Sequence, residues 1–213
     1  MKSPARNCAI ATRALWRRLL AWPFRIKRLG FNARIHRTCK VEGGPCIAIG
    51  ARTVIHARAW LTVPVCAGSQ SHHEPIIVIG SGCSIGQDCG ISAIYRVTVG
   101  KDVLMGPRVW ITDHNHEYRD VSLAVMAQGV TRGGWVVIED NVWIATGAVI
   151  IGARGLRIGI GSVVGANAVV TADVPPHSMV VGNPARVVKR YDPAFHQWVG
   201  TTTGGTTARP HVQ

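Results

Sequence analysis

A six-residue repeat is the feature that most constrains the fold of this chain of 213 residues. An aliphatic residue recurs at every sixth position, often followed by glycine, alanine, serine or threonine. A shift of two residues separates successive sets of three repeats. The repeat positions are Ile49, Ile55 and Leu61; Ile79, Ile85, Ile91, Val99, Met105 and Ile111; and Ile138, Ile144, Ile150, Ile158, Val164 and Val170.

This spacing excludes an α-helical core, because a helix turns every 3.6 residues and would scatter these side chains around its axis. A period of six instead suits a short flat strand followed by a turn in which a small residue permits the bend. Three such units close one triangular coil, and stacked coils bury the aliphatic column. The low aromatic content, 6% against 47% hydrophobic residues, also favours short aliphatic strands. A β-sandwich is the alternative, but its strands would be longer and less regularly spaced.

Two segments interrupt the repeat. The first is rich in polar and charged residues and covers about residues 112–135, and the second covers residues 67–75. Loops inserted into a repeat fold project from one face and often carry the functional site. The larger interruption is therefore the place to look for catalytic residues.

The N-terminal residues form a basic segment. Residues 1–40 carry eleven lysines and arginines and no acidic residue, so the rest of the chain contributes only 13 − 11 = +2 to the net charge of +13. Residues 10–22 are predicted to form an amphipathic helix with arginines opposite tryptophan and leucine. We expect residues 1–28 either to bind an anionic membrane surface peripherally or to cap the open end of the coil. The predicted division is an arm over 1–40, a repeat domain over 41–191 and a flexible tail over 192–213.

Six cysteines are present, with no CxxC pair and no apolar run of the roughly 20 residues that would span a bilayer. We expect the cysteines to be reduced and to pack like alanine or valine. This predicts a cytoplasmic protein, with the inner face of the cytoplasmic membrane as a site of peripheral contact.

Three motifs follow one another in the second half of the chain: ITDHNHEY at 111–118, EDNVWIATGAVI at 139–150 and VVTADVPPHSMVVGNPARVVKRY at 169–191. With the repeats, they make residues 45–191 resemble the hexapeptide-repeat acyltransferases, in the branch of maltose/galactoside and polysaccharide O-acetyltransferases. The resemblance implies an all-β, left-handed parallel β-helix, acetyl-CoA as co-substrate, no metal, and a homotrimer with active sites between subunits.

The resemblance also implies site residues. His114 occupies the place of the family's catalytic histidine. The positions that match cofactor contacts are Trp143, Ala145, Thr146, Ala166, Thr171, Arg186 and Lys189. The chain departs from the family at Ala145, which replaces a common glycine, and at Ala172, which replaces a lysine. The candidate acceptor-binding residues, chosen for their place in or facing the insertion, are Ser92, Asp113, His116 and Glu117.

Histidine suits the chemistry, because acetyl transfer to a hydroxyl needs a base and the unperturbed pKa of histidine is about 6.5. Asp113 is expected to orient either the imidazole or the acceptor. The predicted function is O-acetylation of a sugar hydroxyl on a polysaccharide precursor or saccharide. The alternatives are N-acetylation of an amino sugar or other small amine and a non-catalytic scaffold. A zinc site like that of γ-class carbonic anhydrases lacks its third histidine, and nucleic-acid binding lacks an aromatic platform.

Overall fold

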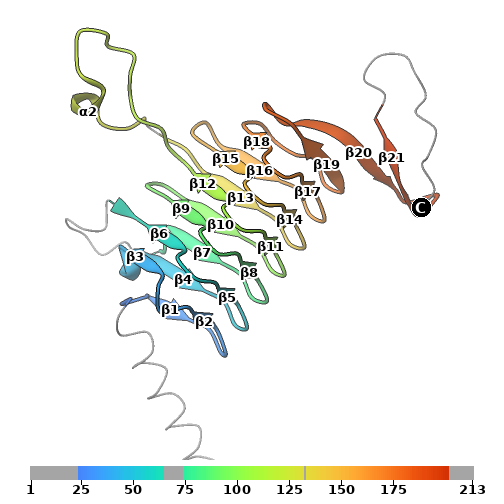
Figure 1. Cartoon of the computed structure of the whole chain (residues 1–213), viewed down its shortest axis with the longest axis horizontal. Helices are drawn as coiled ribbons and strands as arrows, with labels where there is room; N and C mark the ends of the chain where they lie inside the picture. The colour runs from blue at the N-terminus through green and yellow to red at the C-terminus, as the bar shows by residue number, and fades with distance from the viewer. Residues whose placement is uncertain (1–23, 65–73, 132, 202–213) are drawn as a thin grey trace, which may run out of the picture.

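The computed structural model describes residues 24–64, 74–131 and 133–201. Short strands wind into a left-handed parallel β-helix with three flat faces, stacked as coils from blue to orange in Figure 1.

Sheet A contains β1 (Arg28–Leu29), β4 (Ile47–Ile49), β7 (Ile77–Ile79), β10 (Val97–Val99), β13 (Val136–Ile138) and β16 (Leu156–Ile158). Sheet B contains β2 (Arg34–Ile35), β5 (Val54–Ile55), β8 (Ser84–Ile85), β11 (Leu104–Met105), β14 (Trp143–Ile144), β17 (Val163–Val164), β19 (Ser178–Val181), β20 (Arg186–Asp192) and β21 (Gln197–Gly200). Sheet C contains β3 (Lys40–Glu42), β6 (Trp60–Thr62), β9 (Gly90–Ser92), β12 (Trp110–Thr112), β15 (Val149–Ile151) and β18 (Val169–Val170). Within the described residues, two short helices, η1 (Gly44–Cys46) and α2 (Val125–Gln128), lie outside the sheets.

The core is the predicted aliphatic column. Every repeat position named above is buried, from Ile49 in the second coil to Val170 in β18. The strands stack in register, so that Ile111 of β12 lies between Ile91 of β9 and Ile150 of β15. The prediction of a parallel β-helix from the six-residue period is therefore confirmed.

The three corners of the coil are called the A–B, B–C and C–A corners after the sheets that they join. They turn tightly because one residue in many of them adopts a left-handed backbone, for example Asp102 with φ 55° and Arg108 with φ 58°. Neighbouring corners also approach closely: a Cβ at Gly80 would lie 2.2 Å from the carbonyl oxygen of Gly100. This contact explains why small residues follow the aliphatic repeat positions.

Three cysteines behave as predicted. Cys39, Cys83 and Cys89 are free and buried, and the Cys83 and Cys89 thiols each donate to a carbonyl of the next coil, at 3.1 Å. Burial raises the pKa of all three thiols, which keeps them protonated. Cys46 forms a disulfide, so the expectation that all six cysteines are reduced is wrong at this residue. The cytoplasmic location, which was argued from reduced cysteines, stays a prediction.

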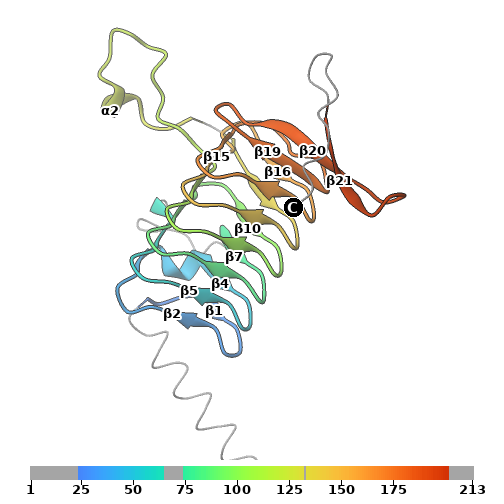
Figure 2. The same cartoon turned by 45° about the vertical axis from the view of Figure 1, so that its right-hand side comes forward.

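The boundaries of the repeat domain differ from the predicted bounds of 41 and 191. Its first turn is made of β1, β2 and β3, so residues 28–40 belong to the repeat domain and not to an arm. At the other end β20 pairs antiparallel with β19, and β21 pairs with β20 up to Gly200 (Figure 2).

The predicted helix over residues 10–22 lies outside the described residues, and membrane contact through residues 1–28 stays a prediction. Within the described ranges, no helix is both long and apolar enough to cross a bilayer.

Candidate active site

The predicted insertion leaves the coil directly after β12, at the C–A corner, and extends away from it (Figure 1). Its two limbs pair where they leave the coil: the Thr131 N–H donates to the Asn115 carbonyl at 2.8 Å, and the Glu117 N–H donates to the Gly129 carbonyl at 3.0 Å. The Tyr95 hydroxyl of the preceding coil donates to the Thr131 carbonyl at 3.0 Å. His114 therefore lies at the fixed root of the insertion. The second predicted interruption, 67–75, falls mostly outside the described residues.

Asp113 and His114 form a pair at this root. The Asp113 side chain is fully buried and the His114 side chain is 14% exposed, with Nδ1 of His114 2.8 Å from Oδ1 of Asp113. Asp113 also accepts the backbone N–H groups of Ile94, Tyr95 and Arg96, at 3.0, 2.8 and 2.7 Å. These three residues form the corner between β9 and β10, one coil before Asp113. The carboxylate thus ties His114 to the neighbouring coil.

Asp113 is ionised in this environment. Burial acts to raise its pKa, but the hydrogen bonds from His114 and from three backbone N–H groups outweigh it and lower the pKa below the usual range. An ionised carboxylate only accepts hydrogen bonds, so Nδ1 of His114 is the donor in this pair, and the neutral tautomer that fits the pair carries its lone pair on Nε2. A neutral imidazole with an available Nε2 is the form needed in a general base. Thr112 adds a further restraint, because its hydroxyl donates to the His114 carbonyl at 2.9 Å.

His114 opens onto a cavity of about 530 Å³ at the C–A corner, here called the His114 pocket. Its lining residues are Glu42, Gly43, Trp60, Thr62, Val63, Pro64, Ser92, Ile94, His114, His116 and Val130. Two of the predicted acceptor residues, Ser92 and His116, are therefore brought together with His114. Asp113 does not line the pocket: its buried carboxylate is bonded to His114 and to the backbone, which fits the orienting role and not direct acceptor contact.

The fourth predicted acceptor residue, Glu117, lies elsewhere. It lines a different cavity of about 500 Å³ together with Tyr118, Arg119 and Arg154. Glu117 forms an ion pair with Arg119, and hydrogen bonds from this arginine lower the Glu117 pKa to about 2. Neighbouring residues in an extended limb point to opposite sides, so His116 and Glu117 face different cavities.

The predicted cofactor residues gather at a different corner from His114. Trp143 is 48% exposed on β14, and Ala145 and Thr146 follow it at the B–C corner. Ala166 occupies the next coil of the same corner, where the Asn167 N–H donates to the Thr146 carbonyl at 2.9 Å. Arg186 joins them, because the preceding Ala185 N–H donates to the Val169 carbonyl at 2.8 Å.

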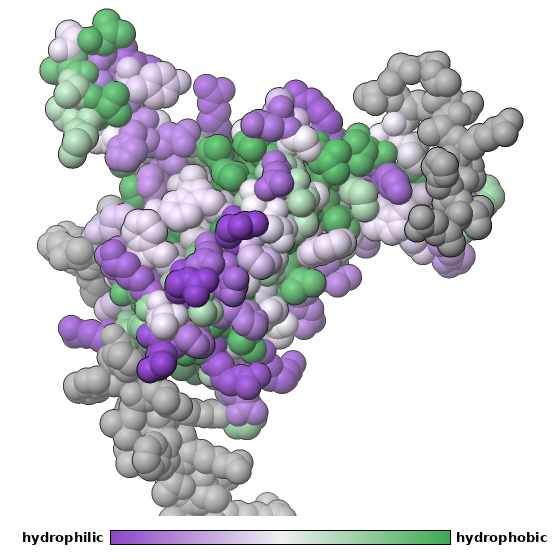
Figure 3. Space-filling view, viewed as in Figure 1, coloured by the Kyte–Doolittle hydropathy of each residue, from purple (hydrophilic) through white to green (hydrophobic). Residues whose placement is uncertain are grey.

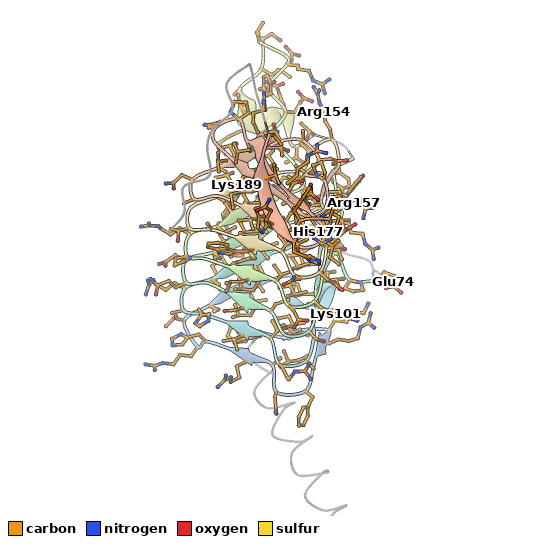
Figure 4. All side chains as sticks on the ribbon, turned by 90° about the vertical axis from the view of Figure 1, so that its right-hand side faces the viewer. Glu74, Lys101, Arg154, Arg157, His177 and Lys189 are labelled. Carbon is orange, nitrogen blue, oxygen red and sulfur yellow. The ribbon has the colours of Figure 1, made fainter. Side chains whose placement is uncertain are left out.

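Two further cofactor candidates lie apart from this group. Lys189 projects from β20, near the C-terminal end (Figure 4), where it is opposite Met179 of β19. Thr171 follows β18 at the C–A corner, two coils beyond β12. Within one chain, the corner that carries Trp143, Thr146 and Ala166 does not face the His114 pocket.

Gly134 makes the geometry at Asp113 testable. It is the residue where the insertion returns to the coil, and a Cβ added there would lie 1.6 Å from the Asp113 carbonyl oxygen. We expect Gly134→Ala to displace Asp113 and His114 and to lower turnover at least tenfold, because small misplacements at a catalytic group are costly. Gly200→Ala is the matched control, since its Cβ would meet only the Val188 carbonyl oxygen at 4.0 Å. Equal turnover of the two variants would show that Gly134 does not position the pair.

Two residues of the His114 pocket, Glu42 and Trp60, were missed by the sequence argument. Trp60 precedes the repeat position Leu61 and therefore points outward, and alignment of the coils places it over Gly90 and Trp110. That alignment is the signal in the sequence that would have revealed it. Glu42 ends β3 of the first coil, most of which falls in the predicted arm over residues 1–40, and no repeat position was predicted beside it.

Comparison with known proteins supports an acyltransferase. No family model matches the chain. WbbJ of Escherichia coli K12, whose name assigns it to O-acetyl transfer in lipopolysaccharide biosynthesis, is 30% identical over 169 residues, 76% of this chain and 85% of WbbJ. A probable acetyltransferase of Mycobacterium tuberculosis is 32% identical over 82% of this chain. The chain spans about half the length of that relative and of one from Schizosaccharomyces pombe, 55% and 48%.

Solved structures share the fold. A maltose O-acetyltransferase from Clostridium difficile 630 superposes with a TM-score of 0.52 at 25% identity, over 78% of this chain and 70% of that chain. AntD, an N-acyltransferase from Bacillus cereus solved with dTDP and 3-hydroxybutyryl-CoA, superposes with a TM-score of 0.63 over 82% of this chain and 88% of AntD, at 17% identity. At that identity AntD shares the fold alone. Together with the match over most of WbbJ, these likenesses establish that the chain belongs to the hexapeptide-repeat acetyltransferases.

Proposed function

We propose that the protein transfers an acetyl group from acetyl-CoA to a hydroxyl of a saccharide, with His114 as the general base. The observation that carries this proposal is the Asp113–His114 pair, whose Nε2 stays free at the root of the insertion. The pair adjoins a cavity in the size range of small-molecule sites, whose largely apolar wall carries a few polar side chains, among them Thr62, Ser92 and His116. Family membership supplies the acyl chemistry that such a base would serve.

The reaction follows from the protonation states. Nε2 of His114 takes the proton of the acceptor hydroxyl while the hydroxyl oxygen attacks the thioester carbonyl. Asp113 stabilises the imidazolium that forms, since its ionised carboxylate is 2.8 Å from Nδ1. The tetrahedral intermediate then collapses, the carbon–sulfur bond breaks, and the imidazolium returns its proton to the leaving thiolate. No covalent intermediate on the protein is required.

The active site is proposed to be completed by a second copy of the chain, in a homotrimer. His114 lies at the C–A corner, whereas Trp143, Thr146, Ala166 and Arg186 gather at the B–C corner. Two corners of one triangular coil point in different directions, so they can border the same cleft only when two coils stand side by side. Closed symmetry makes the same contact three times around a threefold axis.

The tip of the insertion is consistent with such an assembly. Figure 3 shows hydrophobic residues in green at the far end of the insertion, where α2 lies. In and just before α2, Val121 is 99% and Met126 94% exposed, and Leu123 and Val125 are 52% and 49% exposed. Contiguous exposed apolar side chains at a protruding tip mark interaction surfaces in soluble proteins. A neighbouring copy is the proposed partner.

Transfer to oxygen is favoured over transfer to nitrogen by the names of WbbJ and the C. difficile structure. The test is release of free CoA thiol from acetyl-CoA by the purified full-length protein, with saccharides that carry hydroxyls only and with matched amino sugars. The acetylated product is then treated with alkaline hydroxylamine, which cleaves O-acetyl esters and leaves amides intact. Thiol release that needs the amino sugar, or a product that resists hydroxylamine, would replace O-acetylation by N-acetylation.

A further inference from the structure

Two tryptophans on sheet C lie together although they are two coils apart. Trp60 is on β6 and Trp110 on β12, with Gly90 of β9 between them. Their ring centroids are only 5.8 Å apart, because Gly90 has no side chain and Trp110 lies over it. A Cβ at Gly90 would be 2.0 Å from the Trp110 ring. The result is an aromatic surface beside the His114 pocket, and Trp60 lines that pocket.

A fixed carboxylate adjoins this surface. Glu42 Oε1 is 3.0 Å from the Lys40 ammonium, and Oε2 accepts from the Trp60 indole N–H and the Thr62 hydroxyl, each at 3.1 Å. The lysine and these two donors lower the pKa of Glu42, so it is ionised at neutral pH. Each carboxylate oxygen can accept more than one hydrogen bond. Glu42 therefore presents a pre-oriented acceptor of hydrogen bonds to the pocket that it lines.

The pocket is long. Glu42, Thr62, Ser92 and Thr112 stand at matching positions of β3, β6, β9 and β12, three strand spacings from end to end. At about 4.8 Å per spacing, this column measures roughly 14 Å. His114 lies at one end of it and Glu42 at the other, with buried Thr62 and Ser92 between them. A single sugar ring at His114 would leave the Glu42 and Trp60 end empty.

We propose that Trp60 and Glu42 form a recognition subsite for a neutral oligosaccharide acceptor, which places one sugar ring on Trp60 while another presents its hydroxyl to His114. The apolar face of a pyranose ring packs on an indole, and its hydroxyls donate to the fixed carboxylate. Because an ionised carboxylate only accepts hydrogen bonds, Glu42 matches hydroxyl donors and offers no donor to a sugar that carries a carboxylate of its own. This inference rests on the proposed function, because it names the acceptor of the same site.

The test measures saccharide binding without acetyl-CoA, so it does not depend on turnover. The full-length protein is applied to an array of neutral glucans, galactans, mannans and rhamnans, from monosaccharide to hexasaccharide, with matched oligosaccharides that contain uronic acids. We expect affinity to rise from the monosaccharide to the trisaccharide for neutral sugars. Trp60→Ala should weaken binding about 10- to 100-fold, as loss of a tryptophan anchor does. Trp60→Phe should retain most of the binding, and Glu42→Gln should weaken it about tenfold.

Trp198→Ala is the matched control, since Trp198 is 38% exposed against 37% for Trp60 and lies on β21 far along the coil. Unchanged saccharide binding by Trp60→Ala and Glu42→Gln, or no array binding by the wild-type protein, would overturn the subsite. If the variants lose binding while the wild-type protein transfers no acetyl group, the subsite stands and the proposed function fails. If the variants bind normally while acetyl transfer proceeds, the function stands and the subsite fails.

Discussion

Replacement of His114 by alanine should lower kcat for acetyl transfer by about 10²- to 10⁴-fold, the usual contribution of a general base. The His114 imidazole lines the pocket, and its hydrogen bond to Asp113 through Nδ1 fixes the tautomer in which Nε2 can accept a proton. The KM for acetyl-CoA should stay nearly constant, because His114 is not among the residues that match cofactor contacts. Initial rates over a range of both substrates measure the two effects separately.

His36→Ala is the matched control for this variant. His36 is exposed and follows β2 in the first coil, where its Nδ1 contacts the hydroxyl and the backbone N–H of nearby Thr38, at 2.8 and 3.3 Å. Its loss should leave kcat unchanged. A His114→Ala protein that turns over at the rate of His36→Ala would remove His114 from the mechanism.

Replacement of Asp113 by asparagine should reduce both turnover and stability. An amide has one acceptor oxygen and donates from its nitrogen, so it cannot serve His114 and three backbone N–H groups at once. We expect kcat to fall at least 100-fold, because the imidazole loses its orientation and the stabilisation of its charged form. A buried unsatisfied group costs about 1–3 kcal/mol of folding free energy, which a lower Tm would report.

The same carboxylate gives the fold a pH dependence. The pKa of Asp113 is lower in the folded protein than in the unfolded chain, so its ionisation stabilises the fold above the unfolded-state pKa of about 3.9. This contribution is lost as the pH falls through the folded-state pKa, and Asp113→Asn should lack it. Asp173→Asn is the control, since Asp173 is exposed and accepts the backbone N–H of Arg157 at 2.8 Å. Equal kcat and Tm for the two variants would contradict the orienting role.

The repeat made the fold predictable, because burial of each sixth residue is a local pattern that needs no long-range information. The same pattern continues at Leu29, Ile35 and Val41, which pack against the core in the first coil. The prediction missed it because Arg28, Arg34 and Lys40 precede them and give the segment a strongly basic composition. Those three side chains are exposed, at outward positions of their strands. The basic composition of this segment therefore comes from the outer surface of a coil, and it does not indicate a separate arm.

Only the site residue that a sequence motif marks directly, His114, could be predicted with its role. His114 could be identified from its motif, but the role of Asp113 depends on a corner formed by residues 94–96, which are distant in sequence and adjacent in the stack. Glu117 was assigned to the acceptor because it neighbours His116, and the alternation of side chains in a paired limb turns it to another cavity. Trp60 could have been found by aligning the predicted coils, because it precedes the repeat position Leu61, whereas Glu42 required the register of the first coil, for which no repeat position was predicted.

In the proposed assembly His114 of one chain works with the B–C corner of a second chain, and mixing the subunits of two inactive variants tests this arrangement. His114→Ala lacks the base, and Ala166→Trp blocks the B–C corner at an exposed alanine. Each variant alone should be inactive. Co-expressed in equal amounts, the two variants form mixed trimers. In half of the clefts the first chain supplies an intact His114, and in half the second chain supplies an intact B–C corner. Both are intact in roughly a quarter of the clefts, so roughly a quarter of the wild-type activity should return. Mixed preparations no more active than the two separate variants would contradict a site shared between chains.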